Sequence, residues 1–137
     1  MYKPAFSYQD FDVAVTGIAS LQNGLLIFER NKTWVWMNPP FGSPPVAITS
    51  IIGCSNADSI QKLSGTLTYR TVDGRAGTID NPVIWQSEHG VFASNGQPPI
   101  CISEFINSEY VTCNTNASVT VHDSLNGMIY FIVDKGE

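Results

Sequence analysis

The chain has 137 residues, a length typical of one domain that buries a hydrophobic core without obligatory disulfides or metal. Hydrophobic residues make up 43% of it and charged residues only 14%, a balance that excludes an intrinsically disordered chain. The formal net charge is -5, and only seven residues are Lys or Arg. Because phosphate binding depends on clustered basic side chains, we expect no specific nucleic-acid binding.

Runs of β-branched and aromatic residues alternate with glycine and proline along the chain, a pattern typical of short strands. No run of about eleven residues free of Gly and Pro has a helical apolar period, so we expect an all-β fold with little helix. The runs 25–28 and 34–37 are continuously apolar, which predicts strands covered on both faces. The expected strands, in chain order, cover residues 25–29, 33–37, 46–52, 66–72, 83–86 and 128–133.

Four dipeptides have the composition of two-residue hairpin turns of type I′, in which both residues have positive φ. A proline-rich segment at residues 38–45 predicts a stiff loop between two strands. The four turn dipeptides are Asn23-Gly24, Asp73-Gly74, Asn95-Gly96 and Asn126-Gly127.

A short unit occurs three times, at residues 17–30, 87–96 and 124–133. Each copy has a serine or small residue, polar residues, a glycine and then an apolar run. Repeated strand-turn-strand units are typical of bladed or solenoid architectures. We therefore expect a single domain, residues 1–137, made of blade-like units at approximately 13–52, 53–106 and 107–137.

The three cysteines, Cys54, Cys101 and Cys113, have no metal-ligand spacing, and we expect reduced, partly buried thiols. A Cys101–Cys113 bridge remains the alternative. The sequence shows no secretory signal pattern and no apolar run near the ~20 residues that a membrane span needs, so we expect synthesis in the cytoplasm and no membrane span.

Candidate catalytic residues are few. His89 and His122 are the only histidines, and each is adjacent to a carboxylate, but adjacency in sequence does not supply the geometry of a catalytic pair. The phosphate-binding glycine motifs and the zinc-protease and hydrolase signatures are missing from the sequence. No carboxylate pair suggests itself for sugar cleavage. We expect no catalytic residues, no cofactor and no metal.

Aromatic side chains are the best candidates for contact with a partner or glycan, because they dominate recognition surfaces. Trp34 and Trp36 are two residues apart and share one face of a regular strand. Packing in the core is the alternative role for the whole set. The candidate contact residues are Trp34, Trp36, Phe41, Tyr69 and Trp85.

Four segments resemble β-propeller proteins of phage virions, in particular the tail hub or nozzle proteins of short-tailed phages. Residues 16–36 are similar to that family's strand, turn, Leu-Leu-Ile-Phe strand and following strand, and residues 52–60 resemble the Gly-Cys segment that opens the next blade. Residues 83–92 resemble a blade strand, turn and strand, and residues 119–123 with 127–131 look like the start of a third blade. The segment 63–82 is longer than the expected link between blade strands.

The resemblance implies a noncatalytic virion structural protein, a tail hub, nozzle or adaptor component around the DNA exit channel. About two and a half blades do not close a ring, since propellers need roughly four to eight. The expected partners are therefore other virion proteins or copies of the chain itself. A compact β-sandwich or barrel is the alternative fold. A carbohydrate-binding module for the host surface is the second functional hypothesis, and a polysaccharide-degrading enzyme is the third.

Overall fold

The computed structural model describes residues 14–38, 44–49, 51–103, 114–123, 125 and 128–134. Within these residues the protein is all-β, as predicted, and its single helical element is a 3-10 turn, η2 (Ala57–Ser59). All pairs of neighbouring strands are antiparallel. The strands are β1 (Val15–Ser20), β2 (Gly24–Glu29), β3 (Thr33–Met37), β4 (Val46–Thr49), β5 (Gln61–Lys62), β6 (Thr66–Arg70), β7 (Ala76–Asp80), β8 (Val83–Ser87), β9 (Gly90–Ser94), β10 (Ile100–Cys101), β11 (Asn114–Asp123) and β12 (Met128–Asp134).

The first sheet is a four-stranded meander in the order β1-β2-β3-β4. Side chains alternate between its two faces because successive strand residues point in opposite directions. One face carries Ala19, Leu26 and Phe28, which are buried in a hydrophobic cluster. The opposite face carries a row of residues that are paired across the sheet, Ile18 with Ile27 and Ile27 with Trp34.

The second sheet has the order β10-β9-β8-β5, so it is also a meander of four strands. The hairpin of β6 and β7 is inserted between its first strand, β5, and its second, β8. This insertion accounts for the unexpected length of the segment 63–82. Hydrogen bonds from Leu63 N–H to Pro82 O (2.9 Å) and from Asn81 N–H to Gly65 O (2.6 Å) close the base of the hairpin.

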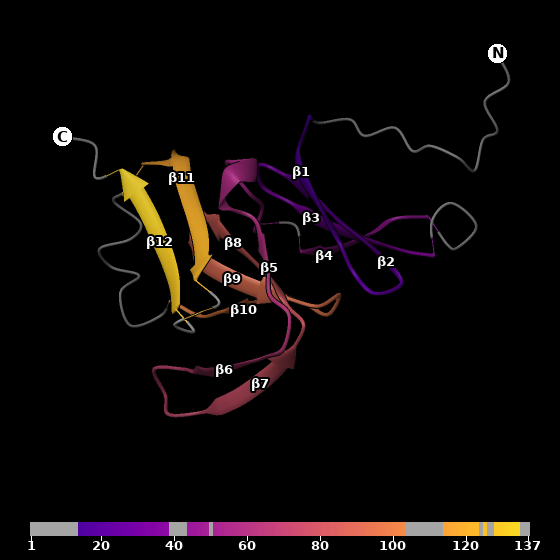
Figure 1. Ribbon diagram of the computed structural model, residues 1–137. Helices are drawn as coiled ribbons and strands as arrows, with labels where there is room; N and C mark the ends of the chain where they lie inside the picture. The colour runs from indigo at the N-terminus through magenta and orange to yellow at the C-terminus, as the bar shows by residue number, and fades with distance from the viewer. Residues whose placement is uncertain are drawn as a thin grey trace, which may run out of the picture.

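The two sheets and the β11–β12 hairpin stack as three layers in chain order, with the second sheet in the middle (Figure 1). Trp85 and Phe92, which are paired across the second sheet, face the first sheet. Ile84, Val91 and Ala93 point the other way, where Ile129 and Val133 of β12 pack against them. The β6–β7 hairpin contributes Leu67, Tyr69 and Ile79 to this second cluster.

Corresponding elements of the first two sheets lie side by side. Their first strands meet where Lys62 Nζ donates a hydrogen bond to Ser20 Oγ (3.1 Å). Their second strands meet where the rings of Phe28 and Trp85 approach to 4.8 Å between centroids. The turns that follow those second strands meet through an ion pair, Arg30 Nη2 to Glu88 Oε1 at 2.9 Å. The second sheet therefore repeats the first in nearly the same orientation.

Every residue of β8 and β9 is buried, which makes these strands the centre of the molecule. Trp85 and Phe28 have no exposed surface, and burial of a large apolar side chain contributes ~1.5–3 kcal/mol to stability relative to exposure. A continuously apolar run did not always predict a strand that is buried on both faces. Leu26–Phe28 is buried as predicted, whereas Trp34–Trp36 is half-buried and Met37 is exposed.

The hairpins form where predicted, but the turn type is wrong at the three dipeptides that the structure describes. Asn23, Asp73 and Asn95 lack the positive φ that a type I′ turn needs at its first position. The connections are longer than two residues, since β1 ends at Ser20 and β6 ends at Arg70. Gly24 is instead required by close approach, because a Cβ there would lie 2.5 Å from Trp36 O. Asn126-Gly127 lies outside the described residues.

Gly53 and Cys54 tie the link between the two sheets to the first sheet. Cys54 N–H donates to Glu29 O (2.9 Å), and a Cβ on Gly53 would lie only 2.2 Å from that same oxygen. Cys54 is fully buried, and burial raises the pKa of its thiol above the ordinary value of 9.0. Cys101 is half-buried on β10, with its sulfur 3.7 Å from Ser103 Oγ. Cys113 lies outside the described residues.

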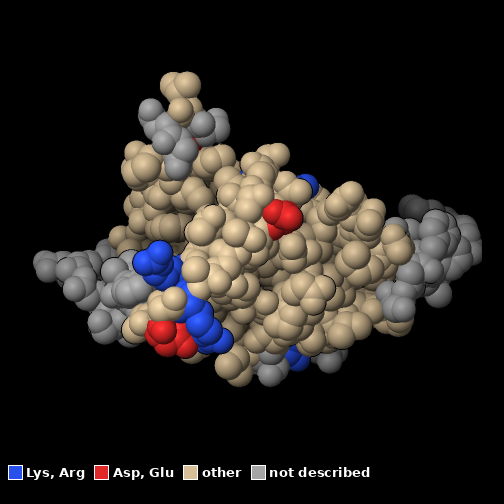
Figure 2. Space-filling model, turned by 90° about the horizontal axis from the view of Figure 1, so that it is seen from below, with Lys and Arg blue, Asp and Glu red and all other residues tan. Residues whose placement is uncertain are grey.

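In the part of the chain that the structure describes, no helix is both long and apolar enough to cross a membrane. The face seen from below carries few charged side chains (Figure 2). The net charge of -5 is therefore not concentrated into one acidic surface on that side.

Candidate functional site

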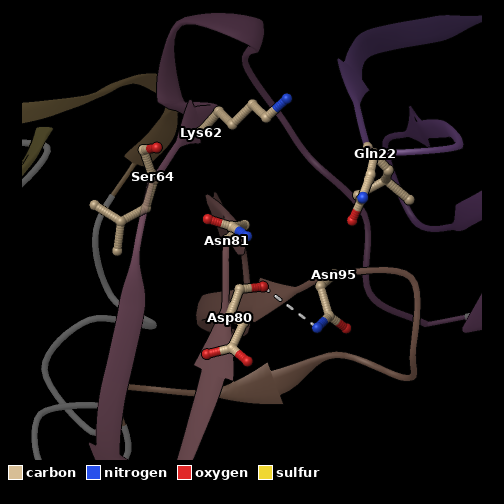
Figure 3. A pocket seen from close by; sticks show the side chains of 8 residues that line it. Gln22, Lys62, Ser64, Asp80, Asn81 and Asn95 are labelled. Atoms are coloured by element: carbon tan, nitrogen blue, oxygen red, sulfur yellow. Dashed lines mark hydrogen bonds between the residues drawn. The ribbon is translucent and has the colours of Figure 1, made fainter.

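A polar cavity of about 480 Å³ opens where four connections meet beside the first two sheets (Figure 3). The β1–β2 turn, the segment after β5, the β7–β8 turn and the β9–β10 turn each supply part of its wall. Two leucines provide the apolar part of the lining, and the rest is polar. The lining residues are Leu21, Gln22, Lys62, Leu63, Ser64, Asp80, Asn81 and Asn95.

Hydrogen bonds to the backbone hold several of the polar groups of this cavity. Asn81 has φ 49°, a left-handed conformation that Asn adopts more readily than most residues, and its Oδ1 accepts from Gly65 N–H (2.9 Å). Asn95 Nδ2 donates to Asp80 O (3.4 Å). These bonds fix the shape of the cavity and leave the Gln22 and Ser64 side chains at its wall (Figure 3).

The cavity has one carboxylate, that of Asp80, which accepts a hydrogen bond from Thr66 Oγ1 (2.7 Å). Glycoside cleavage uses two carboxyl groups about 5 to 9.5 Å apart, and no second acidic residue lines this cavity. The lining offers amide, hydroxyl, amine and carboxylate groups without a nucleophile held by a base.

Trp34 and Trp36 lie on the face of the first sheet that points away from the second sheet, as their spacing predicts. Trp34 Nε1 donates to Glu29 Oε2 (2.9 Å), and Lys32 Nζ lies 5.1 Å from the Trp34 ring centroid. Trp36 Nε1 is buried and has no hydrogen-bond partner among the described residues. Both tryptophans are half-buried.

The other candidate aromatics lie elsewhere. Trp85 is fully buried in the centre of the stack, where its Nε1 donates to Gly53 O (3.2 Å). Tyr69 is half-buried on β6 and packs on the second hydrophobic cluster. Phe41 lies outside the described residues. The structure thus brings Trp34 and Trp36 together and separates Tyr69 and Trp85 from them.

The two histidines are on different elements. His89 is in the exposed β8–β9 turn, and His122 is half-buried on β11. Among the residues with described positions, no three His, Cys, Asp or Glu side chains gather in a way that would hold a metal ion.

Sequence reasoning missed two features. The first is the polar cavity. Its residues come from four separate connections, and in the sequence only Asn81 and Asn95 stood out, as turn residues. The second is an apolar surface on the outer side of the β11–β12 hairpin. Its members alternate along β12 and pair with β11, a period-2 signal that is readable once the strand is assigned. They are Val121, Met128, Tyr130 and Ile132, with exposed fractions of 44%, 49%, 47% and 54%.

No protein-family model matches the chain, and it has no significant match among curated proteins or solved structures. The resemblance to phage tail propellers therefore stays a prediction.

Proposed function

We propose that this protein is a noncatalytic scaffold whose sheets stack as the blades of a β-propeller do. One observation carries the proposal: consecutive four-stranded meanders stack face to face with their corresponding strands and turns side by side. Lys62–Ser20, Phe28–Trp85 and Arg30–Glu88 are contacts between equivalent elements. A β-sandwich also packs two sheets, but here the second sheet is covered on both faces, which favours a continuing stack.

The sequence resemblance supports a narrower proposal, that the scaffold is a component of a phage tail hub, nozzle or adaptor. The mechanism is geometric. Sheets with close-packed interfaces hold their connecting loops in fixed positions around a central path, through which DNA would leave the particle.

Mass spectrometry of purified virions from the source phage tests this proposal. We expect the chain in stoichiometric amounts in gradient-purified particles, together with loss of infectivity when it is deleted. Its presence only in the soluble fraction of infected cells, with normal particles formed without it, would overturn the virion assignment.

A carbohydrate-binding module is the second candidate, favoured by the half-buried Trp34 and Trp36 on one sheet face. Aromatic faces stack on sugar rings. On a glycan array of host surface polysaccharides, we expect binding to be lost in Trp34→Ala and retained in part in Trp34→Phe, which keeps an aromatic ring. Absence of binding by the wild-type protein would remove this candidate.

A further inference from the structure

The two ends of the stack carry apolar sheet faces that no further layer of the described residues covers. The leading face belongs to the first sheet and consists of Ile18, Leu25, Ile27, Trp34 and Trp36, on the side away from the second sheet. The trailing face belongs to the β11–β12 hairpin and consists of Val121, Met128, Tyr130 and Ile132. Sheets that are apolar on both faces are normally covered on both.

The repetition within the chain indicates what would cover the leading face. In the second sheet, the cross-strand pair Trp85–Phe92 faces the preceding layer. The pair at the same place in the first sheet is Ile27–Trp34, which joins the second and third strands in the same way. The leading face is thus the counterpart of a surface that, one layer along, is packed against a sheet.

The leading face is only partly covered. In the row of Ile18, Ile27 and Trp34, Ile18 is 58% exposed and Trp34 is half-buried, whereas Ile27 is buried at 3%. Trp85 and Phe92, the counterparts of Ile27 and Trp34, are 0% and 6% exposed.

The trailing face fits the role of that layer. Successive residues of β12 point to opposite sides of the hairpin. Ile129 and Val133 point to the second sheet, and the residues of the trailing face point away from it. Four apolar side chains, each more than two-fifths exposed, stand together on two paired strands. Contiguous exposed apolar patches of this kind mark interaction sites.

We propose that the trailing face of one copy of this chain packs on the leading face of a second copy. The inference rests on the stacked-blade arrangement of the proposed function. It is a head-to-tail contact between different surfaces, which closes into a ring when the rotation per copy allows it. Each copy brings about two and a half blades, since its third layer is the two-stranded β11–β12 hairpin. Two copies bring about five, and two is the smallest number of copies that reaches the roughly four to eight blades of known propellers. The expected assembly is a ring of two copies.

The test measures the native mass of the purified wild-type chain and of variants with an aspartate at each end. We expect twice the monomer mass of 15.0 kDa for the wild type. Ile18→Asp on the leading face and Ile132→Asp on the trailing face each place a charge in the contact and should weaken dimerisation about 100-fold. Val72→Asp is the control, since Val72 is 61% exposed in the β6–β7 turn, away from both faces. Circular dichroism confirms that each variant folds.

Mixing the two end variants distinguishes head-to-tail packing from the pairing of like faces. In an equimolar mixture, the intact trailing face of Ile18→Asp can pack on the intact leading face of Ile132→Asp. A dimer of the two variants should therefore form in part. If either variant alone keeps the dimer at wild-type strength, the faces pair with themselves and the proposal is wrong.

A monomeric wild type overturns this inference while leaving incorporation into virions intact. A dimer that is missing from particles supports this inference and overturns the virion assignment. The two proposals therefore fail separately.

Discussion

The first and second sheets have the same strand order and stack in the same sense, but the second is enclosed and the first is not. The residues of β8 and β9 are all buried, including Gln86, Ser87 and Ser94, while β3 with its two tryptophans is half-buried. The more hydrophobic strand is thus the more exposed one. Place in the stack, rather than composition, sets the burial of each strand. The buried polar groups are hydrogen-bonded, Gln86 to β11 of the next layer and Ser87 and Ser94 to the backbone of their own turns.

Replacement of a tryptophan in each sheet tests this comparison with the largest expected effect. Trp85→Ala leaves a cavity at the centre of the stack and should lower the free energy of unfolding by ~3–5 kcal/mol. Trp34→Ala, in the half-buried position, should lower it by only ~1–2 kcal/mol. Urea denaturation of both variants measures the difference. Equal losses would mean that the leading face is as enclosed as the centre.

Gly53→Ala tests the link between the two sheets. The added Cβ would meet the backbone oxygen of Glu29, which cannot move without disturbing β2, so we expect a loss of ~2–3 kcal/mol. Gly17→Ala is the control, because its nearest neighbour is the flexible end of the Ile60 side chain. Thermal denaturation should give Gly53→Ala a clearly lower melting temperature than Gly17→Ala. The reverse order would show that the link between the sheets tolerates displacement.

Gln86→Leu tests how the third layer is held to the second. Gln86 Nε2 donates to Val119 O (2.9 Å) and to Thr120 Oγ1 (3.1 Å), and the apolar replacement leaves these acceptors without that donor. We expect a loss of ~1–3 kcal/mol and faster amide hydrogen exchange in β11. Gln97→Leu, at an exposed site, should change stability by less than ~0.5 kcal/mol. Unchanged exchange in β11 would contradict the role given to Gln86.

The ion pair between the turns of the two sheets should contribute least. Arg30 and Glu88 are about half exposed, and such pairs contribute ~0.2–1 kcal/mol. A double-mutant cycle with Arg30→Ala and Glu88→Ala measures the coupling, which should fall in high salt. A coupling well above 1 kcal/mol would mean that turns, as well as layers, hold the sheets together.

The sequence predicts half of the strands, because β-branched and aromatic runs between turn residues have a local cause. The six expected strands correspond to β2, β3, β4, β6, β8 and β12 and agree with them within three residues at each end, whereas β1, β5, β7, β9, β10 and β11 were not in that list. Turn type did not follow from Asn-Gly and Asp-Gly, because loop length depends on how far each strand stays paired with its neighbour. The apolar runs did not predict which strands are buried on both faces either. That burial depends on neighbouring sheets, which come from distant parts of the chain.

The candidate site was predicted less well than the fold. The shared face of Trp34 and Trp36 follows from the two-residue period of a strand. The separation of Trp85 and Tyr69 from them follows from stacking order, which has no local signal. The polar cavity joins turns that are far apart in sequence, and only three-dimensional packing brings Gln22, Lys62 and Asn95 to the same cavity.

The β6–β7 hairpin has a practical consequence. Its tip at residues 71–75 is largely exposed, with Gly74 in a left-handed conformation. The hairpin forms its own two-stranded sheet and leaves the pairing of β5 with β8 and of β8 with β9 intact. Exposed tips of this kind accept inserted sequence. A peptide tag or a heavy-atom cluster inserted there would mark each copy at one point, so that the spacing of the marks in electron micrographs would report the symmetry of any larger particle.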